Sequence, residues 1–264
     1  MLSLISSHLR AVLRDKVLYA VFGVTIVLIL SVPSLSSFSM RQVQELAITL
    51  SLSAISLMLL VVTLLLGASS IWRDIERRYT LSILSLPISR GTYILSKFIS
   101  IAIFQLICLI VLGAGAALVI VFSAHVYPSE VSVPWGNIVI ALYGDFLKYL
   151  LLASFSLVLS AVSTSFYLPF FSTLVLYLCG SASQEVYEYV TSQLGQSLHP
   201  VSSMIVSSLY YILPNFSGFN FHVQAVYGLD IELSAVGFSF AYALIYICIL
   251  LSVAVFAFNK RELL

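Results

Sequence analysis

Runs of roughly 20 apolar residues recur along the whole chain and leave little room for any other organisation. Each run is long enough to cross the hydrocarbon core of a bilayer as an α-helix. Only 9% of the 264 residues are charged and 61% are apolar, whereas a soluble globular domain has about 25% charged residues. The alternating pattern of a membrane β-barrel is absent. Because backbone groups in lipid must be paired internally, the sequence predicts an all-α polytopic membrane protein.

We predict a single transmembrane domain over residues 1–264 with six spanning helices. The spans are predicted at 17–32, 46–70, 98–123, 146–164, 166–183 and 233–258. Residues 1–16 place apolar side chains at helical spacing among basic ones, which predicts an interfacial elbow helix; a signal peptide is the rival interpretation. Residues 200–213 are apolar but too short to cross comfortably. We expect them to form an outer re-entrant or interfacial helix before the last span.

The basic residues indicate the orientation of this arrangement. All but two of the twelve Lys and Arg residues fall on one side of the membrane, the exceptions being Arg41 and Lys148. Loops rich in Lys and Arg remain on the cytoplasmic side. We therefore expect a cell inner or plasma membrane location with both termini cytoplasmic. The stretch 184–233 contains acidic residues but no Lys or Arg, so we expect it outside.

The segment 71–97 is the most basic part of the chain and holds five of the twelve Lys and Arg residues. Apolar residues on one helical face of 71–84 predict a helix lying half in the interface and half in water. Pro87 should end this helix, and Ser89 can cap a second one. Taken alone, the basic residues are explained by the inside-positive rule together with contact to lipid headgroups.

This segment resembles the permease subunits of ATP-binding cassette (ABC) exporters of the ABC-2 class. The residues that carry the resemblance are Glu76-Arg77-Arg78, Thr80-Leu81, Leu84-Ser85, Pro87-Ile88-Ser89-Arg90 and Lys97, while Tyr79 and Ser96 depart from the usual pattern. Residues 213–220 resemble a Leu-Pro-Asn-x-x-x-Phe-Asn element in a subset related to the permease that helps mature nitrous oxide reductase. The ending at 258–263 is similar to the usual ending of these permeases.

The resemblance implies a complex of two permeases with two cytosolic nucleotide-binding ATPase subunits. This chain would be the permease subunit of an exporter, and the helix after its second span would be a cytoplasmic coupling helix. The candidate coupling residues are Arg73, Glu76, Arg77, Arg78, Thr80, Pro87 and Arg90. The chain has no G-x-x-x-x-G-K-[ST] phosphate loop, so ATP and Mg would bind to the partner ATPase. We expect no catalytic residue, metal or cofactor in this chain and no nucleic-acid partner.

Small and hydroxyl residues share one face of the second predicted span. They are Thr49, Ser53, Ser56, Thr63 and Gly67. In lipid, such a face allows close helix approach or forms a polar lining. The resemblance places this span against the partner permease, so we predict a translocation or dimer face. The simpler alternative is packing within the chain, with the hydroxyls bonded to their own backbone.

Asp145 and Lys148 are three residues apart beside the fourth predicted span, close enough to form an ion pair on a helix. Such a pair is either a functional site or an ion pair at the outer headgroup level. Two other classes of function stay open. One is an ATPase-coupled anchor or sensor without transport. The other is an intramembrane enzyme, which needs convergent His, Asp or Glu residues within the spans, whereas all four histidines are predicted outside them.

Overall fold

The computed structural model describes residues 2–39, 42–76, 89–126, 132–192 and 200–261. Within these ranges the regular secondary structure is helical, as predicted. The α-helices are α1 (Leu2–Val12), α2 (Lys16–Ser36), α3 (Val43–Glu76), α5 (Arg90–Val126), α6 (Trp135–Val162), α7 (Tyr167–Thr191), α8 (Pro200–Ile212), α9 (His222–Tyr227) and α10 (Leu233–Lys260), with a short 3-10 helix, η2, at Ser217–Phe219.

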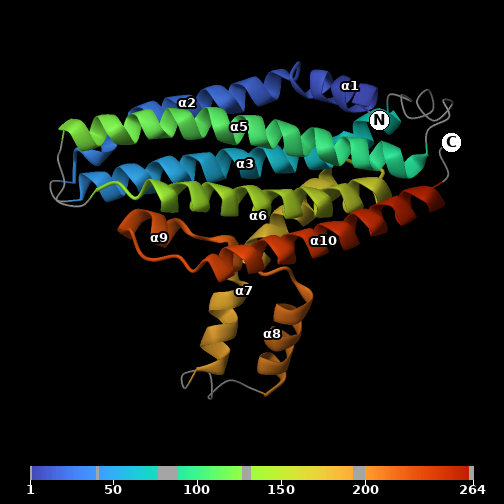
Figure 1. Cartoon of the computed structure of the whole chain (residues 1–264). Helices are drawn as coiled ribbons and strands as arrows, with labels where there is room; N and C mark the ends of the chain where they lie inside the picture. The colour runs from blue at the N-terminus through green and yellow to red at the C-terminus, as the bar shows by residue number, and fades with distance from the viewer. Residues whose placement is uncertain (1, 40–41, 77–88, 127–131, 193–199, 262–264) are drawn as a thin grey trace.

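Five long helices form the bundle: α2, α3, α5, α6 and α10 (Figure 1). These are the helices of the described ranges that are long and apolar enough to cross a membrane. The two central ones are α3 and α6, since 61% of the most apolar stretch of each is buried, against 33% or less in the other three. A helix that is apolar all round is suited to such a central position.

The N-terminal residues form a helix of their own, as predicted for an elbow. α1 packs against α5 and is followed by a short turn before α2. Asp15 caps α2, because its Oδ1 accepts a hydrogen bond from the Val17 N–H at 3.1 Å. The position of α1 at a membrane interface stays a prediction.

α7 leaves the bundle and projects from its side together with α8 (Figure 1). Tyr187 of α7 stacks on Tyr210 of α8 with ring centroids 4.2 Å apart. The Tyr210 hydroxyl also donates a hydrogen bond to Gln184 Oε1 at 2.9 Å. Among the described helices, α7 is not one of the five that meet the length and hydropathy of a span, so the count of six spans stays a prediction. α8 supplies the short helix expected at 200–213, and its depth in the membrane is likewise a prediction.

The helices extend beyond the predicted spans, and in α6 and α3 the extension includes predicted site residues. α6 begins at Trp135, well before the predicted start at 146, so Asp145 and Lys148 lie within the helix. The reason is that these two charges are paired with each other and do not have to reach water. α3 continues to Glu76 without a break. The predicted coupling helix therefore begins as the last turns of α3, and residues 77–88 lie outside the described ranges.

The segment that follows α8 returns to the bundle and packs closely on two glycines. A Cβ atom at Gly144 of α6 would collide with the backbone carbonyl of Phe219. A Cβ atom at Gly180 of α7 would lie 2.6 Å from the carbonyl oxygen of Pro214. Only a residue without a side chain allows the returning backbone to come this near.

Asn215, within the Leu-Pro-Asn element, ties the same segment to two helices. Its Nδ2 donates to Gln184 Oε1 of α7 at 2.7 Å, and its backbone N–H donates to the Tyr242 hydroxyl of α10 at 3.0 Å. The short helix α9 is thereby delivered against α3 and α6.

We expect Gly144→Ala to lower the free energy of unfolding by about 1–3 kcal/mol, because the new methyl group must displace backbone and not a flexible side chain. Gly115→Ala in α5 is the matched control. Its Cβ would have no neighbour within 4 Å, and alanine favours a helix, so stability should be unchanged or higher. Thermal unfolding of both purified variants in detergent measures the difference. Equal midpoints for the two variants would contradict the close approach.

Candidate functional site

A buried carboxylate lies inside the bundle, on α6. Asp145 has no exposed surface. Lys148 Nζ lies 2.7 Å from its Oδ1, and His222 Nε2 lies 2.9 Å from its Oδ2. His222 is the first residue of α9 and comes from the stretch predicted to lie outside. An isolated buried charge is very unfavourable, so both partners are needed to keep the carboxylate in this position.

Ser56 of α3 and Tyr149 of α6 extend this arrangement. The Ser56 hydroxyl donates to Asp145 Oδ1 at 3.3 Å, and its oxygen lies 2.7 Å from the Tyr149 hydroxyl. The Tyr149 ring also stacks against Tyr177 of α7, with centroids 6.1 Å apart. We call the set Ser56, Asp145, Lys148, Tyr149 and His222 the buried ionic network. Its members come from α3, α6 and α9, so one carboxylate joins the central helices to the returning segment.

The sequence predicted the Asp145–Lys148 pair but not its third partner. The two residues are three apart on one helix, and side chains at that spacing lie close enough to form an ion pair. His222 lies 77 residues from Asp145. No periodicity or motif connects residues so far apart in sequence. The sequence therefore did not predict the contact of His222 with α6.

The buried ionic network does not have the arrangement of a hydrolytic site. The Ser56 hydroxyl is engaged with a carboxylate and a phenol, and the His222 Nε2 is engaged with Asp145. A serine nucleophile instead needs a hydrogen bond to its general base. Within the described ranges, no group of His, Cys, Asp and Glu side chains could hold a metal ion. The arrangement joins α3, α6 and α9 to one another through Asp145.

The predicted hydroxyl face of α3 is divided by the structure. Thr49 and Ser53 are exposed, and Ser56 enters the buried ionic network. Thr63 is buried: its hydroxyl donates to the Leu59 carbonyl at 2.6 Å and accepts from Gln105 Nε2 at 2.6 Å.

Gly67 is also covered by the chain's own helices, since a Cβ there would lie 2.5 Å from Ser156 Oγ of α6. For Thr63 and Gly67 the structure therefore shows packing within the chain, which was the alternative. Exposure leaves Thr49 and Ser53 as the part of the face available to a second copy or a substrate, and that role stays a prediction.

Three of the predicted coupling residues are described: Arg73 and Glu76 at the end of α3, and Arg90 at the start of α5. Arg73 forms an ion pair with Asp15, at 2.8 Å between Nη1 and Oδ2. Glu76 is exposed at the last residue of α3. The Arg90 Nη1 donates to the carbonyls of Phe258, Asn259 and Arg261 at 2.9, 3.1 and 2.9 Å, which holds the end of α10 against the start of α5. Arg77, Arg78, Thr80 and Pro87 lie outside the described residues.

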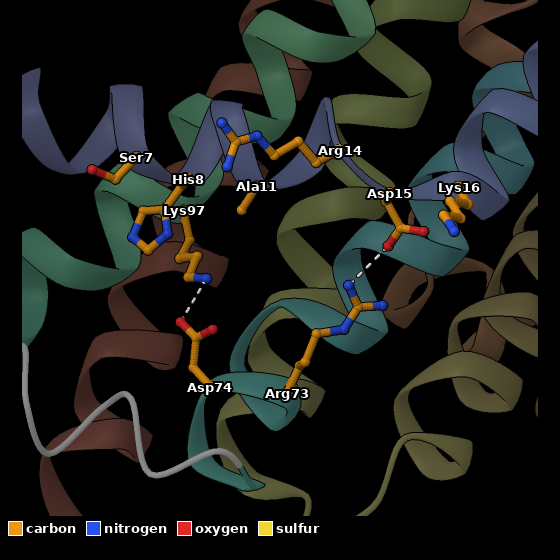
Figure 2. Close-up of a pocket in the computed structure, with 9 residues that line it drawn as sticks. All are labelled: Ser7, His8, Ala11, Arg14, Asp15, Lys16, Arg73, Asp74 and Lys97. Atoms are coloured by element: carbon orange, nitrogen blue, oxygen red, sulfur yellow. Dashed lines mark hydrogen bonds and ion pairs between the residues drawn. The ribbon is translucent and has the colours of Figure 1, made fainter.

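A second ion pair fastens α3 to α5 beside these residues. Asp74 Oδ2 lies 2.7 Å from Lys97 Nζ and accepts a hydrogen bond from the Tyr93 hydroxyl at 2.6 Å. Figure 2 shows this pair and the Asp15–Arg73 pair side by side. The predicted cap is present as well, since Ser89 Oγ accepts from the Thr92 N–H at 3.2 Å. The two helices that flank residues 77–88 are thus joined to each other by ionic contacts.

Comparison with known proteins agrees with this architecture. A protein-family model described as ABC-2 family transporter protein matches residues 8–263. The match includes the helices of the bundle, the buried ionic network and the whole of segment 71–97. No curated protein matches the chain significantly. The likeness to the nitrous oxide reductase subset stays a prediction.

We expect Asp145→Asn to lower the free energy of unfolding by about 3–5 kcal/mol, because it leaves a buried lysine without its carboxylate. Asp145→Asn combined with Lys148→Met removes both charges and should recover much of that loss. Thermal unfolding of the two single variants and the double variant in detergent gives the coupling energy. Losses that simply add would show that the two side chains do not depend on each other.

Proposed function

Because this chain belongs to the ABC-2 family of transporter proteins, we propose that it is the permease subunit of an ABC exporter. The chain is an integral multi-pass membrane protein. We assign it to the cell inner or plasma membrane, with both termini cytoplasmic. Separate cytosolic ATPase subunits bind ATP and Mg and supply the energy, and a second permease copy or a homologue completes the route.

The continuity of α3 is the observation that supports this mechanism best. α3 has 34 residues, so it is a rod of about 50 Å. Near one end Arg73 and Asp74 hold it to Asp15 and Lys97. Closer to the other end, Ser56 joins it to the buried ionic network. A single helix therefore connects the segment proposed to meet the ATPase with the segment proposed to face outside.

The ionic contacts at the cytoplasmic end make α3 and α5 respond together. Residues 77–88 connect the two helices, and Asp74 binds both Lys97 and Tyr93 of α5. A force applied by the ATPase on this connection is transmitted to both helices. The hydrogen bonds of Arg90 transmit the same force to the end of α10.

Displacement of α3 relative to α6 acts on the polar contact of Ser56, near the middle of α3, with Asp145. Polar contacts of this kind can exchange partners. His222 of α9 contacts the same carboxylate. ATP-driven movement of α3 therefore changes how the returning segment sits on the bundle, which opens or closes the outer side of the route.

Glu76→Lys tests docking at the cytoplasmic end of α3. The side chain is exposed, so the fold should be unaffected, while removal of a desolvated charge contact costs about 2–5 kcal/mol of binding to the ATPase. We expect co-purification with the ATPase subunits and permease-dependent ATP hydrolysis in proteoliposomes to fall at least tenfold. Glu185→Lys on α7 makes the same change at an exposed residue on the side proposed to be external and should have no effect.

A permease with Glu76→Lys, Arg77→Glu and Arg78→Glu together that still supports full ATP hydrolysis would overturn this docking site. The same assay addresses the alternative of an anchor or sensor. An ATPase that binds this chain and hydrolyses ATP while no compound crosses the membrane would favour that alternative.

A further inference from the structure

A cavity of about 750 Å³ lies between α1 and the neighbouring ends of α3 and α5 (Figure 2). Most of its lining residues are polar or charged, and they come from three parts of the chain that are distant in sequence. The lining residues are Ser7, His8, Ala11, Arg14, Asp15, Lys16, Arg73, Asp74 and Lys97. Neither the family match nor the proposed coupling role assigns a ligand to this space.

The cavity has an excess of positive charge. Its four cationic side chains face two carboxylates, so the lining has a net charge of +2 when His8 is neutral. Asp15 is paired with Arg73, and Asp74 is paired with Lys97. Within the described ranges, Arg14 and Lys16 have no ion-pair partner. The cavity is therefore suited to an anion with about two negative charges or to one face of a larger anionic group.

His8 forms a largely buried wall of the cavity. Only 5% of its surface is exposed, yet in the described part of the chain its buried Nε2 has no hydrogen-bond partner. Its ring is held edge-on to Tyr93, with centroids 5.8 Å apart. Burial, with a contribution from Lys97, lowers the pKa of His8 to about 4, so the imidazole is neutral at physiological pH. The ring therefore adds no charge to the cavity, and its buried Nε2 does not face the space that a ligand would occupy.

A second, apolar groove begins at the same place and favours a lipid over a free anion. This groove has a volume of about 130 Å³ and shares Asp15 with the polar cavity. It runs between α5 and the segment formed by the α1–α2 turn and the start of α2. Both α2 and α5 are long and apolar enough to span a membrane. Its lining is otherwise almost entirely apolar: Val12, Leu13, Leu18, Tyr19, Phe22, Phe104, Ile107, Cys108 and Val111. A ligand with a phosphate group next to a hydrocarbon chain would place the phosphate in the polar cavity and the chain in the apolar groove.

We propose that this paired site binds an anionic glycerophospholipid, with the phosphate-bearing headgroup in the polar cavity and part of one acyl chain in the groove between α2 and α5. The headgroup contacts Arg14 and Lys16. The bound lipid joins α1 to α3 and α5 next to residues 77–88. The site does not depend on the exporter mechanism, because binding is a property of this chain alone.

Native mass spectrometry of the purified full-length chain in detergent tests the proposal. Dioleoyl-phosphatidylglycerol and dioleoyl-phosphatidylcholine have the same acyl chains and differ in net charge, so we expect the first to bind at least tenfold more tightly. Arg14→Gln should weaken its binding about fivefold, and Arg14→Gln with Lys16→Gln about 25-fold. Both side chains are exposed, so these variants should keep their thermal stability.

Two further variants separate the site from general surface charge. Arg10→Gln removes an equally exposed cation of α1 that does not line the cavity, and it should leave the affinity unchanged. His8→Phe keeps the ring against Tyr93 and removes a buried, neutral imidazole, so it should also leave phosphatidylglycerol binding unchanged. Equal losses for Arg10→Gln and Arg14→Gln would overturn the proposal.

Inorganic phosphate distinguishes a lipid site from a site for free phosphate. Millimolar phosphate should not displace phosphatidylglycerol, because it gains nothing from the apolar groove. Full displacement, together with phosphate binding that is lost in the Arg14→Gln, Lys16→Gln variant, would assign the cavity to free phosphate and overturn the lipid assignment.

Discussion

The buried carboxylate of Asp145 is the interaction on which the rest of the arrangement depends. A charge in an apolar bundle is stable only with partners, and one helix cannot supply enough of them. α6 contributes Lys148, α3 contributes Ser56, and the chain beyond α8 must return to bring His222. Gly144, one residue before Asp145, leaves room for that returning backbone. Polar pairing and close packing are therefore parts of one solution.

The same physical logic applies at the end of α3 near Glu76. There the ion pairs of Asp15 with Arg73 and of Asp74 with Lys97 join the α1–α2 turn and α5 to α3. Between these pairs and the buried ionic network, α3 is packed by apolar contacts and close approaches. Exchangeable polar contacts thus lie near one end and near the middle of α3, an arrangement that suits transmission of a displacement between them.

The sequence predicted what depends on local patterns. Hydropathy predicted the helices of the bundle, and the spacing of Asp145 and Lys148 predicted their ion pair. It could not predict contacts between distant segments, such as that of His222 with Asp145. The sequence also could not predict which hydroxyl residues of α3 are buried and which are exposed. The burial of Thr63 is decided by Gln105 on a neighbouring helix, and no property of α3 alone shows it.

The central claim is that nucleotide acts through α3 on the outer segment. Spin labels at Ser53→Cys on α3 and Val223→Cys on α9 occupy exposed positions on the two elements that the buried ionic network joins. Pulsed electron paramagnetic resonance on the permease–ATPase complex in lipid measures the distance between them with and without trapped ATP. The account predicts a shifted distance with ATP that disappears in the Glu76→Lys variant. An unchanged distance in a complex that still exports its substrate would contradict it.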